Sequence, residues 1–248
     1  MSEYPRYLNR QLYLVFALTF VLCLAGPAGA VTYYYSFDAI TSNNATNATA
    51  GEAQLRMAVT GGADTPFVIC TFYHEGSARM SITRIYFYYK GGPLEGTNFN
   101  DFIFIPKWNG NTGVEFQRIE DLENIRNLPG AKKLGLTKNH IVESFWSNDP
   151  VVKKGINPGE FLQIVFSLPQ GKDIDDVVQA LNGWITDRNF DYGDLVVGLH
   201  VQAIKIKPDS SESSESFVVA PLPPSVLLLG SGLAGLTLAL YRRRRKTA

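Results

Sequence analysis

Apolar residues between positions 31 and 207 follow the two-residue period of β-strands more often than the spacing of helices. In Phe161–Leu168 and again in Leu195–Ile206, every second residue over most of the segment is apolar. Successive side chains of a strand point to opposite faces, so each segment is predicted to be a strand with one buried face. His200 and Gln202 then lie on the face opposite to the apolar set.

Four further runs are rich in β-branched and aromatic residues and are separated by Gly, Pro and Asn, which is typical of strands joined by turns. One of them is apolar on both faces in its second half, as expected of a central strand that is covered on both sides. The runs are Val31–Phe37, Pro66–Tyr73, Phe99–Ile105 and, with the doubly apolar half, Ser81–Tyr89.

A single segment argues well for a helix. Asp173 is placed to cap it, and the apolar residues that recur at helical spacing are Ile174, Val177, Val178, Leu181 and Ile185. Short strands with turn signals and one short helix predict a mainly β domain over residues 31–207, a β-sandwich of roughly seven to nine strands. Residues 208–220 are rich in Ser and Glu, and we expect them to form a polar linker that buries no core.

The 248 residues carry no net charge, but the charge is unevenly distributed. Residues 31–220 contain 22 Asp and Glu against 16 Lys and Arg, whereas the last 28 residues contain five basic side chains and no acidic one. An acidic body argues against nucleic acid as its partner, and a basic tail points to a membrane. With 15 Phe, 12 Tyr and two Cys, the chain is neither disordered over most of its length nor a disulfide-stapled scaffold.

The N-terminus has the features of a secretory signal peptide. Arg6 and Arg10 form a positive region, and Leu12–Ala25 is a run of 14 uncharged residues. Because a membrane span needs about 20 apolar residues, this run is too short to cross a bilayer.

The cleavage site of the signal is predicted from the small residues Ala28 and Ala30. We expect signal peptidase to remove residues 1–30, so that the mature chain begins at Val31. An uncleaved N-terminal anchor is the alternative.

The C-terminus contains a second membrane signal. Ser225–Tyr241 has no charged residue, and the uncharged stretch counted from Pro221 is 21 residues long, enough to cross about 30 Å of hydrocarbon as a single transmembrane helix. A basic cluster follows it and is expected to stay in the cytoplasm, which places the acidic body on the far side of the membrane. A cleaved signal peptide requires that same orientation. The cluster consists of Arg242, Arg243, Arg244, Arg245 and Lys246.

A proline motif, one hydrophobic helix and a terminal arginine cluster, on a chain with an N-terminal signal, resemble the PEP-CTERM sorting signal of Gram-negative bacteria. The resemblance covers residues 221–248, and Leu222 replaces the Glu of the usual Pro-Glu-Pro motif. It implies processing by an exosortase, a membrane-embedded transpeptidase-like protease. A plain type I membrane anchor is the alternative. The motif residues are Pro221, Leu222, Pro223 and Pro224.

The turn before the last predicted strand is a weak candidate for a calcium site. Its oxygen-bearing side chains occupy nearly alternate positions, as in a calcium loop, but Tyr192 and Gly198 stand where an EF-hand needs Gly and Glu. An acidic turn without metal is therefore the favoured interpretation, and an irregular calcium site is the alternative. The candidate ligands are Asp187, Asn189, Asp191 and Asp194.

Tryptophan residues are the best candidates for sugar binding, because aromatic rings stack on pyranose faces. Trp108, Trp146 and Trp184 are predicted to lie near turns, with Trp108 at an exposed loop tip. A carbohydrate site and burial in the core are the two interpretations of these rings. Asn44–Thr46 and Asn47–Thr49 match glycosylation sequons, but in a bacterial protein we expect a polar loop there.

The sequence gives little evidence for an enzymatic site. The three His residues do not accompany a G-x-S-x-G elbow, and no pair of His or Cys has zinc-ligand spacing. Cys70 lies in an apolar strand and is expected to be a small buried hydrophobe. Gly230–Gly235 matches G-x-G-x-x-G, but it lies in a hydrophobic helix without the acidic residue that a dinucleotide site needs. We therefore expect no enzymatic activity and no cofactor.

These observations predict an exported, non-enzymatic protein that is anchored in the inner membrane as a precursor and then reaches the cell surface or the extracellular matrix. The expected partners are the membrane, signal peptidase, an exosortase-type protease and exopolysaccharide. The alternatives are a carbohydrate-binding module, with Trp108 and Trp146 on one exposed face, and a calcium-stabilised adhesin, either of them held by a type I anchor.

Overall fold

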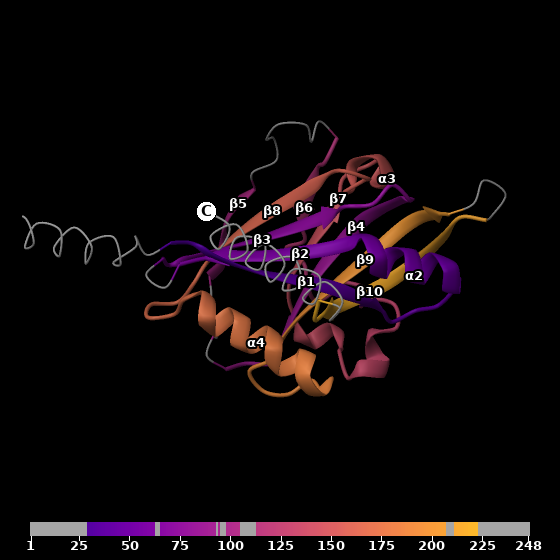
Figure 1. Cartoon of the computed structure of the whole chain (residues 1–248). Coiled ribbons are helices and arrows are strands. Elements are labelled where there is room, and N and C mark those ends of the chain that lie inside the picture. Colours follow the sequence, from indigo (N-terminus) through magenta and orange to yellow (C-terminus); the bar gives the residue numbers. More distant parts are fainter. Residues whose placement is uncertain are drawn as a thin grey trace, which may run out of the picture.

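The computed structural model describes residues 29–62, 65–92, 94, 98–104, 113–206 and 211–222. Strands make up most of this part of the chain (Figure 1). They are β1 (Val31–Ala39), β2 (Leu55–Gly61), β3 (Phe67–His74), β4 (Arg79–Tyr89), β5 (Asn98–Phe104), β6 (Phe116–Arg118), β7 (Ile141–Ser147), β8 (Phe161–Ser167), β9 (Leu195–Lys205) and β10 (Ser213–Ala220). The helices are α2 (Ala45–Gln54), α3 (Val151–Lys154) and α4 (Ile174–Asp187), with short 3-10 helices at Ala131–Leu134 and Lys138–His140.

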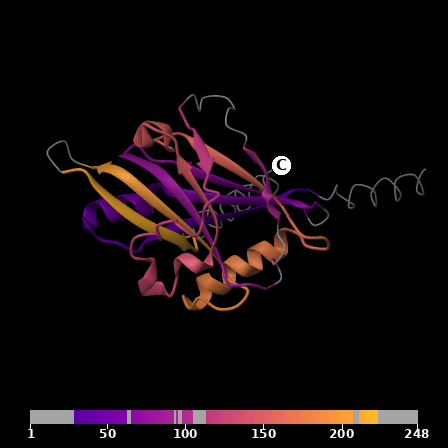
Figure 2. The same ribbon diagram turned by 180° about the vertical axis from the view of Figure 1, so that it is seen from behind.

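The strands form one antiparallel sheet in the order β5-β8-β3-β2-β1-β10-β9-β4-β7-β6. β1 joins the two halves of this sheet, because Val31–Tyr35 pairs with β2 whereas Ser36–Ala39 pairs with β10. We call β5, β8, β3 and β2 the first wing, and β10, β9, β4, β7 and β6 the second wing. The sheet curls so that the wings lie on either side of a common interior (Figures 1 and 2).

Aromatic rings from the two wings meet in this interior. The ring of Phe87 in β4 lies 5.0 Å from that of Phe166 in β8 and 6.2 Å from that of Phe72 in β3, between centroids. Both pairs have the edge-to-face geometry that aromatic rings favour. The prediction of a mainly β fold is confirmed, although the sheet is continuous and has ten strands, where seven to nine were expected.

All six predicted strands coincide with observed ones, namely β1, β3, β4, β5, β8 and β9. The predicted helix is confirmed as α4, which begins after Asp173. The carboxylate of Asp173 accepts hydrogen bonds from the backbone N–H groups of Asp175 and Asp176. The apolar face of α4 is buried, and the helix packs against β2, β9 and β10 on one side of the sheet (Figure 1).

Helix α2 corrects the prediction of a polar loop around the two sequons. Asn44 caps this helix, with its side-chain oxygen 3.2 Å from the backbone nitrogen of Asn47. At Gly51 a β-carbon would overlap the ring of Phe217 in β10, so the helix lies directly against the strand. Small residues allow this close packing, but they give no amphipathic pattern from which the helix could be recognised.

The linker predicted for residues 208–220 is wrong for Ser213–Ala220, which forms β10. This strand lies in the middle of the sheet, between β1 and β9, and its last six residues are buried. The sheet is therefore incomplete without a segment whose Ser and Glu content suggested a spacer.

Glu215 explains how a polar sequence can occupy this position. Its carboxylate is fully buried and accepts three hydrogen bonds, from the hydroxyl of Thr41 (2.7 Å) and from the backbone nitrogens of Asn43 (3.1 Å) and Asn44 (2.7 Å). These donors belong to the turn between β1 and α2. The buried charge is thus satisfied by backbone and hydroxyl groups, as burial of an ionised group requires.

Candidate functional site

The predicted signal cleavage site lies at the very start of the sheet. Ala28 is outside the described residues, and Ala30 is exposed. Val31 begins β1, is 46% exposed, and pairs with Gly61 of β2. Cleavage after Ala30 would therefore leave β1 complete.

The predicted sorting motif begins directly after β10. Pro221 and Leu222 follow the last residue of that strand, and the hydroxyl of Ser36 donates a hydrogen bond to the carbonyl of Pro221. Pro223 and Pro224 lie outside the described residues, as do the predicted transmembrane helix and the basic cluster Arg242–Lys246. Within the described ranges, none of the helices has the length and apolarity needed to span a membrane.

The start of β1 and the end of β10 face the same direction but are offset along β1. β10 runs antiparallel to β1, and its last residue, Ala220, pairs with Ser36. Ser36 is five residues from Val31, which corresponds to about 17 Å at the rise of an antiparallel strand. The chain therefore enters and leaves the sheet on neighbouring strands and on the same side.

The acidic turn uses its oxygen atoms in hydrogen bonds of its own. Asp187 accepts from the backbone nitrogen of Asn189 (2.9 Å), Asp191 accepts from the Asn189 side chain (2.7 Å), and Asp194 accepts from the backbone nitrogen of Asp191 (2.8 Å). Burial raises the pKa of Asp194, whose carboxylate lies against Gly183 of α4. Across the described segments, no group of three or more His, Cys, Asp or Glu residues is arranged to hold a metal ion.

Two of the three tryptophans lie within the described residues, and they occupy different environments. Trp108 is outside the described residues. Trp184 is fully buried in α4, where its indole N–H donates to the carbonyl of Val219 (3.3 Å), so its role is structural. Trp146 is half-buried in β7 on a sheet face, and its indole N–H donates to the hydroxyl of Ser144 (2.9 Å).

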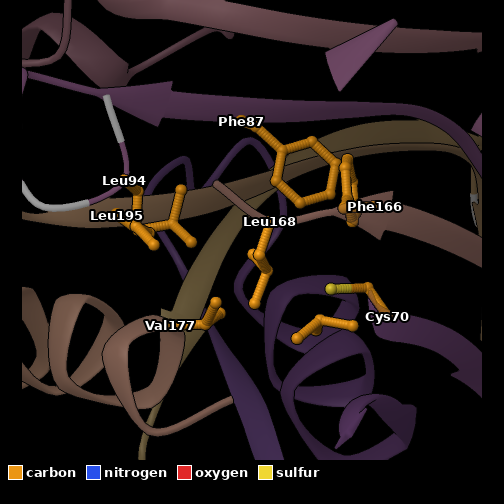
Figure 3. A pocket seen from close by; sticks show the side chains of 8 residues that line it. Cys70, Phe87, Leu94, Phe166, Leu168, Val177 and Leu195 are labelled. Atoms are coloured by element: carbon orange, nitrogen blue, oxygen red, sulfur yellow. The ribbon is translucent and has the colours of Figure 1, made fainter. Parts of the chain in front are cut away.

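Cys70 is a free, buried thiol, as predicted. Burial raises its pKa to about 12, so the thiolate needed for nucleophilic chemistry is not formed at neutral pH. Its sulfur points towards Leu168 beside an apolar cavity of about 30 Å³ between the wings (Figure 3). Phe87 and Leu195 of the second wing and Val177 of α4 also line this cavity. It has room for about one water molecule but offers none of the polar partners that would hold one.

A polar row crosses the second wing on the face that points away from the interior. The strand register places Gln117 opposite Trp146, Trp146 opposite Arg84, Arg84 opposite His200, and His200 opposite Ser216. Directly paired residues share one face of a sheet. We call these five residues the Arg84 row. The prediction that His200 lies on the face opposite to the apolar set is confirmed, although the residue is buried. The row itself was not foreseen, because it depends on which strands pair.

Arg84 lies at the centre of the row, and no carboxylate of the described residues pairs with it. Its guanidinium carbon is 4.0 Å from the centroid of the Trp146 ring, a cation–π contact. Four other arginines in the described ranges form salt bridges with carboxylates, namely Arg56, Arg79, Arg118 and Arg188. Arg84 is half-buried and forms none with the carboxylates of the described residues.

Tyr86 lies two residues beyond Arg84 on the same face, and its hydroxyl is buried without a hydrogen bond of normal geometry. Burial raises the pKa of Tyr86, and the nearby Arg84 charge partly opposes this effect. His200 is also buried, and its ring nitrogens have only long contacts, each 3.4 Å, with the Ser216 hydroxyl and the Gln202 amide nitrogen. Burial, together with the Arg84 charge, lowers the pKa of His200 to about 4.

His74, at the end of β3, is fully enclosed, and neither of its ring nitrogens has a hydrogen-bond partner. Burial lowers its pKa to about 4. Near the β3–β4 turn, the side-chain oxygen of Gln54 accepts a hydrogen bond from the backbone nitrogen of Ala78 (2.9 Å). Burial therefore favours the neutral form of the His74 imidazole.

Comparison of this chain with protein-family models, with curated proteins and with solved structures found no match.

Proposed function

We propose that this chain is an exported, non-enzymatic protein of the cell surface or extracellular matrix, sorted through a C-terminal signal of the exosortase type. In this account signal peptidase removes residues 1–30, and the helix beyond the proline motif holds the precursor in the inner membrane. Processing near Pro221 then releases the folded body, a sandwich-like β-domain, for association with exopolysaccharide.

The observation that carries this proposal is the position of the two expected processing points. β1 begins at Val31 and β10 ends at Ala220, so removal of both terminal segments would spare every strand of the sheet. The two points lie on neighbouring antiparallel strands and face the same direction, offset by about 17 Å along β1. Both predicted signals place the body on the same, far side of the membrane.

The chemistry of the histidines supports a non-enzymatic role. A general base works best with a pKa near the operating pH. Burial lowers the pKa of both His74 and His200 to about 4 and encloses their rings. At neutral pH each is a weak base that a substrate does not reach.

The proposal is tested by the charge of the C-terminal cluster. Replacement of Arg242–Arg245 by Gln removes the positive charge that retains the tail in the cytoplasm. We expect the variant to remain unprocessed or to be lost from the inner membrane, visible as a shifted band on a gel of cell fractions.

A matched control is the double variant Lys132→Gln/Lys133→Gln, which removes exposed positive charge from the body. It should be processed like the wild-type chain. Unchanged processing of the Arg242–Arg245 variant would count against sorting by this signal.

A further inference from the structure

The Arg84 row has the composition of an anion-binding site. A half-buried guanidinium lies at its centre without a carboxylate from the described residues, and the directly paired neighbours Trp146 and His200 carry no negative charge. We propose that Arg84 binds the carboxylate or sulfate group of an acidic polysaccharide on the outer face of the second wing.

The cation–π contact prepares Arg84 for this role. The guanidinium carbon lies over the Trp146 ring at 4.0 Å from its centroid, and this contact restricts the position of the Arg84 side chain. The N–H groups lie in the guanidinium plane and remain able to donate a fork of two parallel hydrogen bonds, which matches the geometry of a carboxylate or sulfate. An ammonium group at this position would provide charge without that fork.

The side chains beside Arg84 are uncharged at neutral pH. The hydroxyl of Tyr86 is buried next to the guanidinium, and this contact with Arg84 partly opposes the rise in the pKa of Tyr86 that burial causes. The contacts of His200 with Ser216 and Gln202 are both at the 3.4 Å limit of a hydrogen bond. Neither Tyr86 nor His200 carries a negative charge that would neutralise Arg84, so the guanidinium charge remains available to an anion.

The site is also accessible from one side. Trp146, Arg84 and Gln202 are half-buried, and Gln117 at the β6 edge is exposed. These positions belong to paired strands of the sheet, which hold them more rigidly than loops would. Because residues 31–220 are acidic overall, a polyanion is not attracted at long range, and recognition depends on this local cation.

This inference rests on the proposed function in one respect: an extracellular protein would meet acidic polysaccharide, which is why a uronate oligomer is the probe. The binding test uses the full-length chain in a nonionic detergent and measures calorimetric titration with an oligomer of glucuronic acid, with sodium sulfate, and with a neutral dextran oligomer. We expect binding of the uronate oligomer, competition by sulfate, and no binding of dextran.

Variants locate the binding. Arg84→Gln should weaken uronate binding by about tenfold or more, as expected for loss of a bidentate charged pair. Arg84→Lys keeps the charge and should retain part of the affinity, which also controls for misfolding of the Gln variant. Arg79→Gln is the matched control, because Arg79 is on the same strand but exposed and paired with Glu212. It should change the affinity by less than about twofold.

Three results would overturn the proposal. The first is an equal loss of uronate affinity in Arg84→Gln and Arg79→Gln. The second is dextran binding as tight as uronate binding. The third is binding of sulfate without binding of uronate, which would make this a site for a free inorganic anion. Sorting is unaffected by any of these results, because Arg84→Gln should be processed at both ends like the wild-type chain. Failure of the anion site and failure of the proposed function are therefore distinguishable.

Discussion

At the residue scale, one buried carboxylate determines whether a polar segment can join the sheet. Glu215 has no exposed area and accepts hydrogen bonds from Thr41, Asn43 and Asn44. Because two of these donors are backbone N–H groups, an amide in place of the carboxylate would point a donor at another donor or leave one unpaired.

We therefore expect Glu215→Gln to lower the free energy of unfolding by about 2 kcal/mol, the cost of an unsatisfied buried polar group. Urea denaturation measures the change. Glu212→Gln is the control, since Glu212 is partly exposed in a surface salt bridge with Arg79, and it should cost less than about 0.5 kcal/mol. Equal costs for the two variants would show that the Glu215 hydrogen bonds do not stabilise the fold.

His74 and His200 make the stability of the body sensitive to acid. Burial lowers both pKa values to about 4, whereas in the unfolded chain they return to about 6.5. Between these values the unfolded state binds more protons, so stability is complete above pH 6.5 and falls as the pH decreases towards 4. The loss is at most about 1.4 kcal/mol per pH unit for each residue.

His74→Leu removes one of these protonation sites without removing a hydrogen bond. The slope of unfolding free energy against pH between 6.5 and 4 should decrease in this variant. His140→Gln is the control, because His140 is half-buried, and it should keep most of the slope. An identical slope in His74→Leu and the wild-type chain would show that His74 is protonated in the folded state.

At the scale of elements, periodicity predicted strands that have apolar or aromatic side chains of their own. Phe161–Leu168 and Leu195–Ile206 were recognisable because one face of each contacts the interior. β10 was not, because its buried carboxylate is satisfied by a turn more than 170 positions away in the sequence. α2 was missed for a related reason, since its small residues fit against Phe217 and leave no apolar stripe.

The candidate sites differ in the same way: some depend on local sequence, and others depend on contacts between distant segments. The processing points were proposed from local composition at the two ends and remain predictions. The burial of Cys70 could be predicted from its apolar neighbours. The Arg84 row could not, because Arg84 meets Trp146 and His200 only through the pairing of β4 with β7 and β9.

The central position of β10 gives a sharp prediction for truncated chains. A chain of residues 31–222 keeps every strand and should unfold cooperatively. A chain of residues 31–211 lacks β10, the strand that lies between β1 and β9. Its free energy of unfolding should fall by about 5 kcal/mol or more, enough to prevent folding. Near-ultraviolet circular dichroism during heating distinguishes the two. A cooperative transition in the shorter chain would show that β10 is dispensable, as a linker would be.

At the scale of the whole molecule, the body is an acidic, curled β-sheet whose two ends are predicted to carry opposite halves of one export route. The sheet begins where the signal peptide is expected to end, and it ends where the sorting motif begins. We propose that Arg84, which forms no salt bridge with the described carboxylates, then lets the released body bind an acidic matrix.

Intact mass spectrometry of the protein recovered from its native cell envelope and culture medium tests this account most directly. The predicted result is a mature chain that begins at Val31 and ends near Pro221. A chain that begins at Val31 but retains Arg242–Lys246 would contradict it, because the protein would then be a simple type I anchored protein and exosortase processing would not occur.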